Sequence, residues 1–246
     1  MPSSDESATG AAVIVGVGSG PGRALALRFA GAGHAVALAA RAPDKLAPLV
    51  AEIEAAGGSA RSYQADATEE QAVEDLFARA EADLGPPELV VYNAGGRNNK
   101  SILDMEAAEF EMIWRSSCLG GMIVGREAAK GMVARGQGTI LFTGGRSSRR
   151  ALAGWAAFAA GKFGLRAVAQ AMAHELSPKG VHVAHMIIEG GIDNERTREL
   201  GNDKVGPDGL LATEALAEVY YQTYLQHRSC WAFEVDLRPW SEPFTT

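Results

Sequence analysis

Cysteine and positive charge are both scarce in this chain of 246 residues. The two cysteines, Cys118 and Cys230, are far apart and lack metal-ligand spacing, so we expect neither a disulfide framework nor a metal site. Lysine and arginine total 23 against 30 acidic residues, a formal net charge of −7. This balance argues against nucleic acid or an anionic membrane as the main partner. No apolar run is long enough to cross a bilayer.

A secretory signal is also missing, because the first ten residues are small, polar and acidic and have neither a basic flank nor an apolar run. The lack of a disulfide pattern fits a reducing compartment. We therefore expect a cytoplasmic protein. Residues 1–10 are expected to be a flexible N-terminal extension, and residues 11–246 to form one domain whose size needs no cross-links for stability.

What the chain does contain is an alternation of strand and helix patterns. Short apolar runs predict seven buried strands, over residues 11–16, 35–40, 59–65, 89–92, 139–143, 181–188 and near 231–237. Long helices are expected over 107–135 and 156–176, a last one over 214–226, and a capped helix start at Thr68 with Gln71. This order predicts an α/β fold of the Rossmann type, with a doubly wound parallel seven-stranded sheet in three α/β/α layers.

One stretch does not follow the alternation. Residues 193–209 are polar and contain three glycines and a proline, which makes an unusually long loop for a compact domain. A plain surface loop is one interpretation, but loops of this length are commonly functional. We therefore predict a substrate lid near residues 193–212.

The turn after the first predicted strand is rich in glycine and reads Gly16-Val17-Gly18-Ser19-Gly20-Pro21-Gly22. Glycine lets the backbone approach a pyrophosphate, and the N-terminus of the following helix supplies free N–H groups and a partial positive charge. A structural tight turn is the alternative, but the run lies in the first strand–turn–helix unit, where a dinucleotide fingerprint belongs. The pattern predicts cofactor contacts from Gly16, Gly18, Ser19, Gly20 and Gly22.

The spacing Gly16-x-x-x-Gly20-x-Gly22 resembles that of the short-chain dehydrogenase/reductase family. Three further motifs follow in the family's order and extend the resemblance over nearly the whole chain: Asp66-Ala67-Thr68, Asn93-Ala94-Gly95, and Lys162 at the lysine of Tyr-x-x-x-Lys. The resemblance implies hydride transfer between a nicotinamide dinucleotide and a small-molecule substrate. It also implies cofactor contacts from Asp66, Ala67, Asn93, Ala94, Gly95, Lys162, Gly190 and Ile192.

The choice of cofactor depends on the end of the second predicted strand. An acidic residue there would bind the ribose 2′-hydroxyl of NAD and repel a 2′-phosphate. This chain instead has Ala39-Ala40-Arg41, in which small residues leave room and Arg41 can hold a phosphate. The family's NADP-type pattern is similar. We therefore expect NADP(H) rather than NAD(H), with Arg23 as a weaker second candidate for the phosphate.

The catalytic positions depart from the family's Asn–Ser–Tyr–Lys set. Phe158 stands four residues before Lys162 in place of tyrosine, Gly145 replaces the serine, and Ser117 aligns with the asparagine. Phenylalanine has no titratable proton, and a positioned general acid is worth about 10²–10⁴ in rate. The family's usual ketone reduction is therefore not expected, although Lys162 remains.

Other side chains could supply a proton or bind substrate, or could simply be pocket and core residues. The candidate donors are Ser147, Ser148, Tyr92, Cys118 and Trp155. Arg146, Arg149 and Arg150 form either an anion-attracting cluster or a solvated basic patch. The loop after the sixth strand reads Ile188-Glu189-Gly190-Gly191-Ile192 where the family usually has Pro-Gly, which makes it one residue longer by comparison.

Two functions remain open from the sequence. The first is an NADP-dependent oxidoreductase with a non-standard proton source, acting on an enone, an imine or a carbonyl compound. The second is a catalytically silent NADP-binding module that acts as a sensor or a partner subunit. In either case we expect a homo-oligomer, a dimer or a tetramer, because the two long helices are apolar on more than one face and need a second burial surface.

Overall fold

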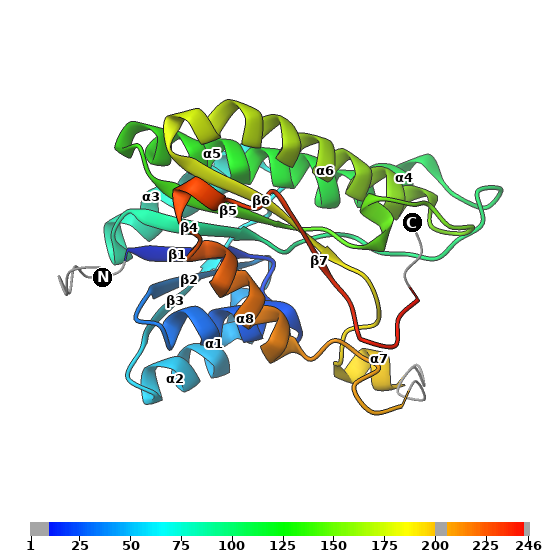
Figure 1. The fold of residues 1–246 in the computed structure, drawn as a ribbon, viewed down its shortest axis with the longest axis horizontal. Coiled ribbons are helices and arrows are strands. Elements are labelled where there is room, and N and C mark those ends of the chain that lie inside the picture. The colour runs from blue at the N-terminus through cyan, green and yellow to red at the C-terminus, as the bar shows by residue number, and fades with distance from the viewer. Residues whose placement is uncertain (1–9, 200–205, 244–246) are drawn as a thin grey trace.

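The computed structural model describes residues 10–199 and 206–243. Within these ranges seven parallel strands form one sheet in the order β3-β2-β1-β4-β5-β6-β7 (Figure 1). The strands are β1 (Ala11–Val15), β2 (Ala35–Ala40), β3 (Ser59–Gln64), β4 (Pro87–Tyr92), β5 (Gly138–Thr143), β6 (Val181–Ile188) and β7 (Glu234–Leu237). The predicted doubly wound parallel sheet is confirmed.

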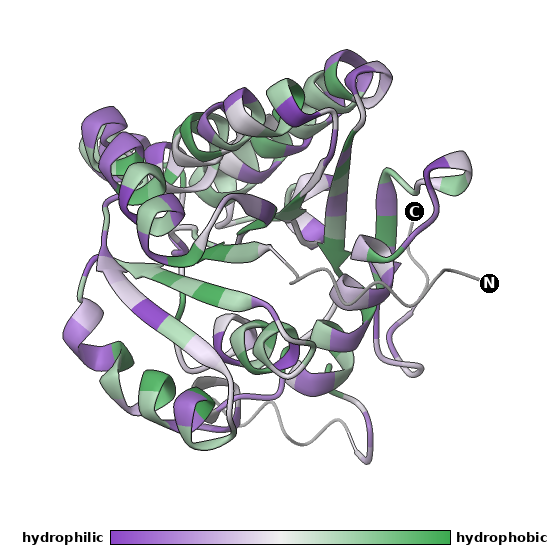
Figure 2. Cartoon of the chain, turned by 90° about the vertical axis from the view of Figure 1, so that its left-hand side faces the viewer, coloured by the Kyte–Doolittle hydropathy of each residue, from purple (hydrophilic) through white to green (hydrophobic). Residues whose placement is uncertain are grey.

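Helices cover both faces of the sheet, so that two apolar cores form (Figure 2). One face carries α1 (Pro21–Ala30), α2 (Ala47–Ala55) and α8 (Thr213–Tyr224). The other carries α3 (Glu70–Leu84), α5 (Gly120–Arg135) and α6 (Ala156–Leu176), with α4 (Ala107–Trp114) beyond them. Short helical turns are η1 (Pro43–Leu46), η3 (Arg146–Ser148), η4 (Ser177–Lys179) and η6 (Arg228–Cys230). No helix in the described ranges is long and apolar enough to cross a membrane.

The strand order reverses direction between β1 and β4. From β1 the chain proceeds outward through β2 and β3, and it then returns to β4 and proceeds the other way through β5, β6 and β7. The loops at the carboxyl ends of β1 and β4 therefore diverge and leave a crevice between them, which is the usual ligand position in such sheets.

The expected helix over residues 107–135 is interrupted. Helix α4 ends at Trp114, a π-helical turn follows over Arg115–Leu119, and α5 then continues to Arg135. In this turn the Ser116 hydroxyl donates to the Ile113 carbonyl oxygen at 3.1 Å. A single extra residue in a turn leaves the apolar pattern nearly unchanged, so the sequence pattern did not reveal it.

Two other expectations about element ends were wrong. Helix α3 begins at Glu70 without a side-chain cap, because both the Thr68 amide and its hydroxyl donate to the Asp66 carboxylate instead. Strand β7 begins only at Glu234, since Trp231 stacks flat on His182 with ring centroids 4.9 Å apart.

The expected lid near residues 193–212 is described only in part. Helix α7 (Glu195–Glu199) lies within it, and Ile192 forms a parallel bridge with Leu211. Residues 200–205 lie outside the described residues, as does nearly all of the expected N-terminal extension over residues 1–10. The lid therefore stays a prediction.

Candidate cofactor and substrate site

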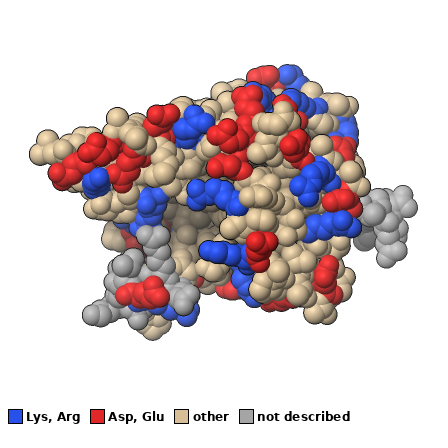
Figure 3. Space-filling view, turned by 180° about the vertical axis from the view of Figure 1, so that it is seen from behind, with Lys and Arg blue, Asp and Glu red and all other residues tan. Residues whose placement is uncertain are grey.

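A cleft of about 1190 Å³ opens at the carboxyl ends of the strands, where the strand order reverses. It is lined by the glycine-rich loop, by the loops after β2, β3 and β4, and by one side of α4. Lysine and arginine side chains border the hollow although the whole chain is acidic (Figure 3). The cleft is thus an elongated cavity with a partly basic rim.

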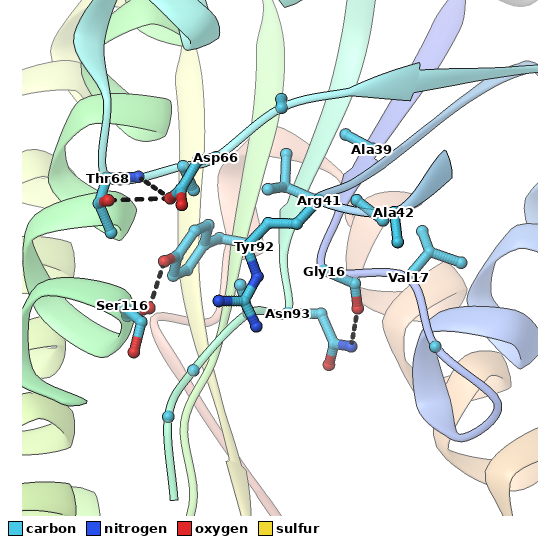
Figure 4. Close-up of a pocket in the computed structure, with 18 of the residues that line it drawn as sticks. Gly16, Val17, Ala39, Arg41, Ala42, Asp66, Thr68, Tyr92, Asn93 and Ser116 are labelled. Atoms are coloured by element: carbon cyan, nitrogen blue, oxygen red, sulfur yellow. Dashed lines mark hydrogen bonds between the residues drawn. The ribbon is translucent and has the colours of Figure 1, made fainter. Parts of the chain in front are cut away.

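The glycine-rich loop is shaped by two close approaches of backbone. Gly16 has φ +90°, and a Cβ there would lie 2.4 Å from the Ala94 backbone nitrogen. The Asn93 side-chain amide donates to the Gly16 carbonyl oxygen at 3.0 Å, which ties this loop to the loop after β4 (Figure 4). A Cβ at Gly22 would lie 2.9 Å from the Val17 Cα, so α1 packs directly against the turn.

The remaining loop residues leave space for a ligand. A Cβ at Gly18 would meet no heavy atom within 4 Å, and Gly18 and Ser19 are exposed and line the cleft. Helix α1 has no side-chain cap at its N-terminus, with Gly20 at the N-cap position. Pro21 has no N–H and the Arg23 amide donates to the Gly20 carbonyl oxygen at 3.0 Å, so Gly22 supplies the first-turn amide for an anion such as a diphosphate.

The end of β3 forms one side of the cleft. The Asp66 carboxylate accepts two hydrogen bonds from Thr68, at 2.9 Å from the amide and 2.8 Å from the hydroxyl (Figure 4). Burial alone would raise the pKa of Asp66, but these bonds and the charges of Arg41 and Arg115 outweigh it, so the pKa is lowered. Asp66 is therefore a fixed carboxylate acceptor that faces the cleft beside Ala67.

The two arginines considered for a 2′-phosphate differ in their surroundings. Arg41 is exposed, lines the cleft and extends its side chain into it (Figure 4). Arg23 also lines the cleft, but its guanidinium is paired with the Glu52 carboxylate at 2.6 Å. Arg41 is therefore the better placed of the two to meet an incoming anion.

The residues expected on the catalytic side come together behind the loop after β4. The Lys162 ammonium is buried and donates to the Thr143 carbonyl oxygen at 2.6 Å, and burial lowers its pKa to about 8. It lies 5.8 Å from the centre of the Phe158 ring. A Cβ at Gly95 would lie 3.5 Å from the Lys162 nitrogen and 3.4 Å from the Ser117 hydroxyl oxygen.

The three positions predicted to replace the family's catalytic residues are open to different degrees. Gly145 has an extended backbone, with φ 178°, and a Cβ there would meet only the Ile188 carbonyl oxygen at 3.4 Å. Ser117 is fully buried, and its hydroxyl points to the Gly96 carbonyl oxygen at 3.5 Å. Phe158 is half-buried beside Lys162. No hydroxyl of tyrosine or serine stands at positions 158 and 145.

Two of the other proton donors considered from the sequence are engaged inside the protein. Tyr92 is fully buried, its hydroxyl donates to the Ser116 carbonyl oxygen at 2.6 Å, and burial raises its pKa. Ser148 is also buried, accepts the Gly145 amide at 3.2 Å and lies 3.3 Å from the His185 ring nitrogen Nε2. Both hydroxyls are thus engaged by neighbouring groups of the protein.

The last three candidate donors are placed as packing groups. Ser147 is buried. Cys118 is buried as well, and its own burial raises the pKa of its thiol. Trp155 packs edge-on against Phe158 at 6.0 Å, and the Arg97 guanidinium lies over its ring at 4.8 Å. Within the described residues no group of three or more potential ligands could hold a metal ion.

The three arginines after β5 are held in ion pairs, an arrangement different from both alternatives considered above. Arg149 pairs with Asp236 of β7 at 2.5 Å. Arg146 and Arg150 both donate to Glu189, and Arg146 also donates to Glu242. Sequence reasoning missed these acids because they lie far along the chain, although alternating acids at 234 and 236 were a visible signal.

The loop after β6 extends from the catalytic side toward the glycine-rich loop. Gly190 has φ +138° and packs against Pro239, and Ile192 bridges to Leu211. The side-chain nitrogen of Asn194 lies 3.8 Å from the position of a Cβ at Gly20. Gly190, Ile192, Lys162, Phe158 and Gly145 lie beside the 1190 Å³ cleft rather than in its lining.

Comparison with known proteins gives consistent matches. A family model described as short chain dehydrogenase matches residues 10–205. A short-chain dehydrogenase/reductase of Armillaria gallica is 33% identical over 186 residues, which cover 74% of this chain and 71% of that protein. A 3-oxoacyl-(acyl-carrier-protein) reductase of Mycobacterium avium is 32% identical over 137 residues, 56% of this chain and only 53% of the reductase.

Solved structures share the fold over nearly the full length. A short-chain dehydrogenase from Rhodopseudomonas palustris has a TM-score of 0.82 and 41% identity, covering 94% of this chain and 99% of that chain. A metagenomic short-chain oxidoreductase in complex with NADP has a TM-score of 0.81 and 25% identity, covering 94% of this chain and 98% of that chain.

Proposed function

The chain belongs to the short-chain dehydrogenase family, and we propose that it is an NADP(H)-dependent oxidoreductase that works without the family's catalytic tyrosine. The observation that carries the proposal is the combination of an intact cofactor cradle with Phe158 beside Lys162. A cytoplasmic location and a homo-oligomeric state belong to the same proposal, and the free thiols of Cys118 and Cys230 fit a reducing compartment.

The cradle fits a dinucleotide phosphate in three places. The exposed backbone at Gly18 and Ser19 and the uncapped start of α1 suit the diphosphate. Arg41 would hold a 2′-phosphate through charge-assisted hydrogen bonds. The Lys162 ammonium, which donates to the Thr143 carbonyl oxygen at 2.6 Å, would bind the hydroxyls of the nicotinamide ribose with its other protons. When bound, the cofactor supplies or accepts a hydride.

The side chains of the site then limit the substrate. Phe158 and Gly145 cannot transfer a proton, and they present an apolar ring and open space instead. Suitable substrates are those whose reduced form takes its proton from water, such as a conjugated enone, or those that need no proton, such as an iminium ion. We propose these two classes ahead of simple ketones.

Steady oxidation of NADPH with a panel of ketones, enones and imines tests this proposal. We expect turnover with enones or imines and little with simple ketones. Fast reduction of simple ketones would contradict the assignment of the proton source. NADPH binding without turnover on any substrate of the panel would instead indicate a silent binding module.

The cofactor preference has its own test in Arg41. Because a hydrogen bond to a charged group is worth about 1.5–3 kcal/mol, Arg41→Ala should weaken NADPH binding more than tenfold and leave NADH binding nearly unchanged. Fluorescence titration of both nucleotides measures this. Arg23→Ala is the matched control, with a small effect expected because Glu52 already engages that guanidinium. Equal losses of affinity for NADPH and NADH in Arg41→Ala would contradict the assignment of Arg41 to the 2′-phosphate.

A further inference from the structure

One buried carboxylate joins the two loops that follow β5 and β6. Glu189 comes directly after β6, and its carboxylate is only 4% exposed. Its Oε1 accepts a hydrogen bond from Arg146 Nε at 2.7 Å and another from Arg150 Nη2 at 2.8 Å. Arg146 is the residue after Gly145, so this ion-pair cluster begins at the vacant serine position.

The position of these loops in the sheet decides which half of a dinucleotide they meet. The glycine-rich loop, Arg41 and Asp66 follow β1, β2 and β3, so they are placed for the adenosine and diphosphate part. A dinucleotide bound across the point of strand reversal must place its other half over the ends of β4, β5 and β6. The loops joined by Glu189 are two of the three loops at those ends.

The course of the loop after β6 supports this placement. Near its start, the Ile188 carbonyl oxygen lies 3.4 Å from the position of a Cβ at Gly145. At its other end, the Asn194 amide lies 3.8 Å from the position of a Cβ at Gly20. The loop therefore spans the distance from the vacant serine position to the glycine-rich loop.

The loop also lacks the rigid proline that the family usually has at this point. The chain has Glu189 followed by two glycines, and Gly190 adopts φ +138°. The Glu189 amide donates to the Leu237 carbonyl oxygen at 2.7 Å, and its carboxylate is fixed by two guanidinium groups. Charge-assisted hydrogen bonds to a buried carboxylate are short and directional. They can therefore fix the loop after β6, whose two glycines would otherwise make it flexible.

We propose that Glu189 is a positioning residue for the nicotinamide half of NADP(H). It acts through Arg146 and Arg150, which hold the loop after β5 and the backbone of residues 189–192 in one arrangement. The proposal rests on the proposed function, because it presupposes that the cleft binds NADP(H).

Measuring the binding of the whole cofactor and of its adenosine half distinguishes a failure of the proposed function from a failure of the proposed role of Glu189. NADPH and adenosine 2′,5′-bisphosphate, which lacks the nicotinamide half, are titrated by calorimetry into the wild type, Glu189→Gln and Glu242→Gln. In Glu189→Gln we expect the Kd of NADPH to rise at least tenfold and the Kd of the bisphosphate to stay within twofold. Glu242→Gln removes the second partner of Arg146 at the surface, so both Kd values should stay within twofold.

Each other outcome has one meaning. If Glu189→Gln leaves NADPH binding unchanged, or weakens both ligands equally, the positioning role is overturned. If the wild type binds neither ligand, the proposed function fails and not the role of Glu189 alone. If Glu189→Gln does not fold, Arg150→Met is used instead, because it leaves the Arg146–Glu189 pair intact. It should weaken NADPH selectively, and an unchanged NADPH Kd would overturn the proposal.

Discussion

In the proposed alignment with the family, Phe158 and Gly145 leave Lys162 without a tyrosine and a serine as partners. The ammonium lies on the same helix, one turn from the Phe158 ring, and is buried against the Thr143 carbonyl. A phenol at position 158 would therefore lie beside a positive charge, which stabilises a phenolate and lowers the pKa of a tyrosine. We therefore expect a tyrosine placed at position 158 to be able to transfer a proton.

The double variant Phe158→Tyr with Gly145→Ser should create weak ketone reduction and alcohol oxidation, which we do not expect of the wild type. A serine fits at 145 because its Cβ would meet only the Ile188 carbonyl oxygen, at 3.4 Å. The two groups act as a unit, so each single change should do little. Nicotinamide absorbance with simple ketones and secondary alcohols measures the gain.

Lys162→Ala in the double variant is the control and should remove the new activity. If the wild type reduces simple ketones as fast as the double variant, another side chain supplies the proton. The interpretation of positions 158 and 145 would then be wrong.

His185 should make the folded state less stable in mild acid. It is fully buried, and its pKa is lowered to about 4, chiefly by burial; Glu234 opposes this shift, and Lys162 and Arg166 add to it. Because the folded pKa lies below the ordinary value of 6.5, the unfolded chain binds the proton more tightly. The free energy of unfolding should therefore fall as pH falls, by about 2 kcal/mol between pH 7 and pH 5 from this group.

Urea unfolding of the wild type and of His185→Gln across this pH range measures the effect. The variant should show a flatter dependence on pH. His182 also has a lowered pKa, but it is present in both proteins and cancels in the comparison. His174→Gln, at an exposed position of α6, is the control and should keep the wild-type slope. An unchanged slope in His185→Gln would contradict the prediction.

At the scale of elements, the π-helical turn and α6 pack closely through glycine. A Cβ at Gly161 would lie 2.6 Å from the Ser117 Cβ, so even a methyl group must displace a neighbour. Gly161→Ala should therefore cost about 1–3 kcal/mol of stability through overpacking, offset by up to ~1 kcal/mol of helix propensity. We expect a net loss in urea unfolding.

Gly131→Ala in α5 is the matched change. A Cβ there would meet only the flexible end of the Arg135 side chain, at 3.0 Å. The same substitution should then stabilise the protein by up to ~1 kcal/mol through helix propensity. Stabilisation by both changes would show that α6 and the π-helical turn adjust freely to each other.

The seven strands and most helices could be predicted because burial on a parallel sheet leaves a strong local pattern. The π-helical turn Arg115–Leu119 could not, since one extra residue scarcely disturbs helical spacing. The start of β7 was misplaced because the Trp231 ring packs on His182, a contact between distant parts of the chain. Local pattern thus predicted the elements, and long-range contacts fixed their ends.

The candidate site likewise contains residues that a local sequence motif predicts and residues that only long-range contacts reveal. The glycine-rich loop, Asn93 and Lys162 could be predicted as site residues because each belongs to a motif that is continuous or nearly so along the chain. In the sequence Glu189 stands out only as a departure from the family, and its proposed role depends on Arg146 and Arg150 from another loop. Ion pairs between separate loops leave no spacing rule in a sequence.

At the scale of the whole molecule, large apolar side chains remain exposed on neighbouring helices. Met112 of α4 is 60% exposed and Phe163 of α6 is 40% exposed. We expect these helices to pack against further copies of the chain, so light scattering at micromolar concentration should give the mass of two or four chains.

Phe163→Glu with Met112→Lys should shift that mass toward one chain. Leu225→Lys is the control, because Leu225 is 52% exposed just after α8 on the other face of the sheet. A monomeric wild type would rule out the homo-oligomer.

Because α8 packs on α1, one of the two apolar cores cannot be completed until the ribosome has synthesised α8. Ala217 and Tyr220 are buried in the core that contains Phe29, and the Tyr220 hydroxyl meets that of Thr143 at 2.9 Å. At ~5–20 residues per second, α8 emerges roughly 10–40 s after α1. Until then the nascent nucleotide-binding half exposes an uncovered apolar surface, so this half should need chaperone protection during translation.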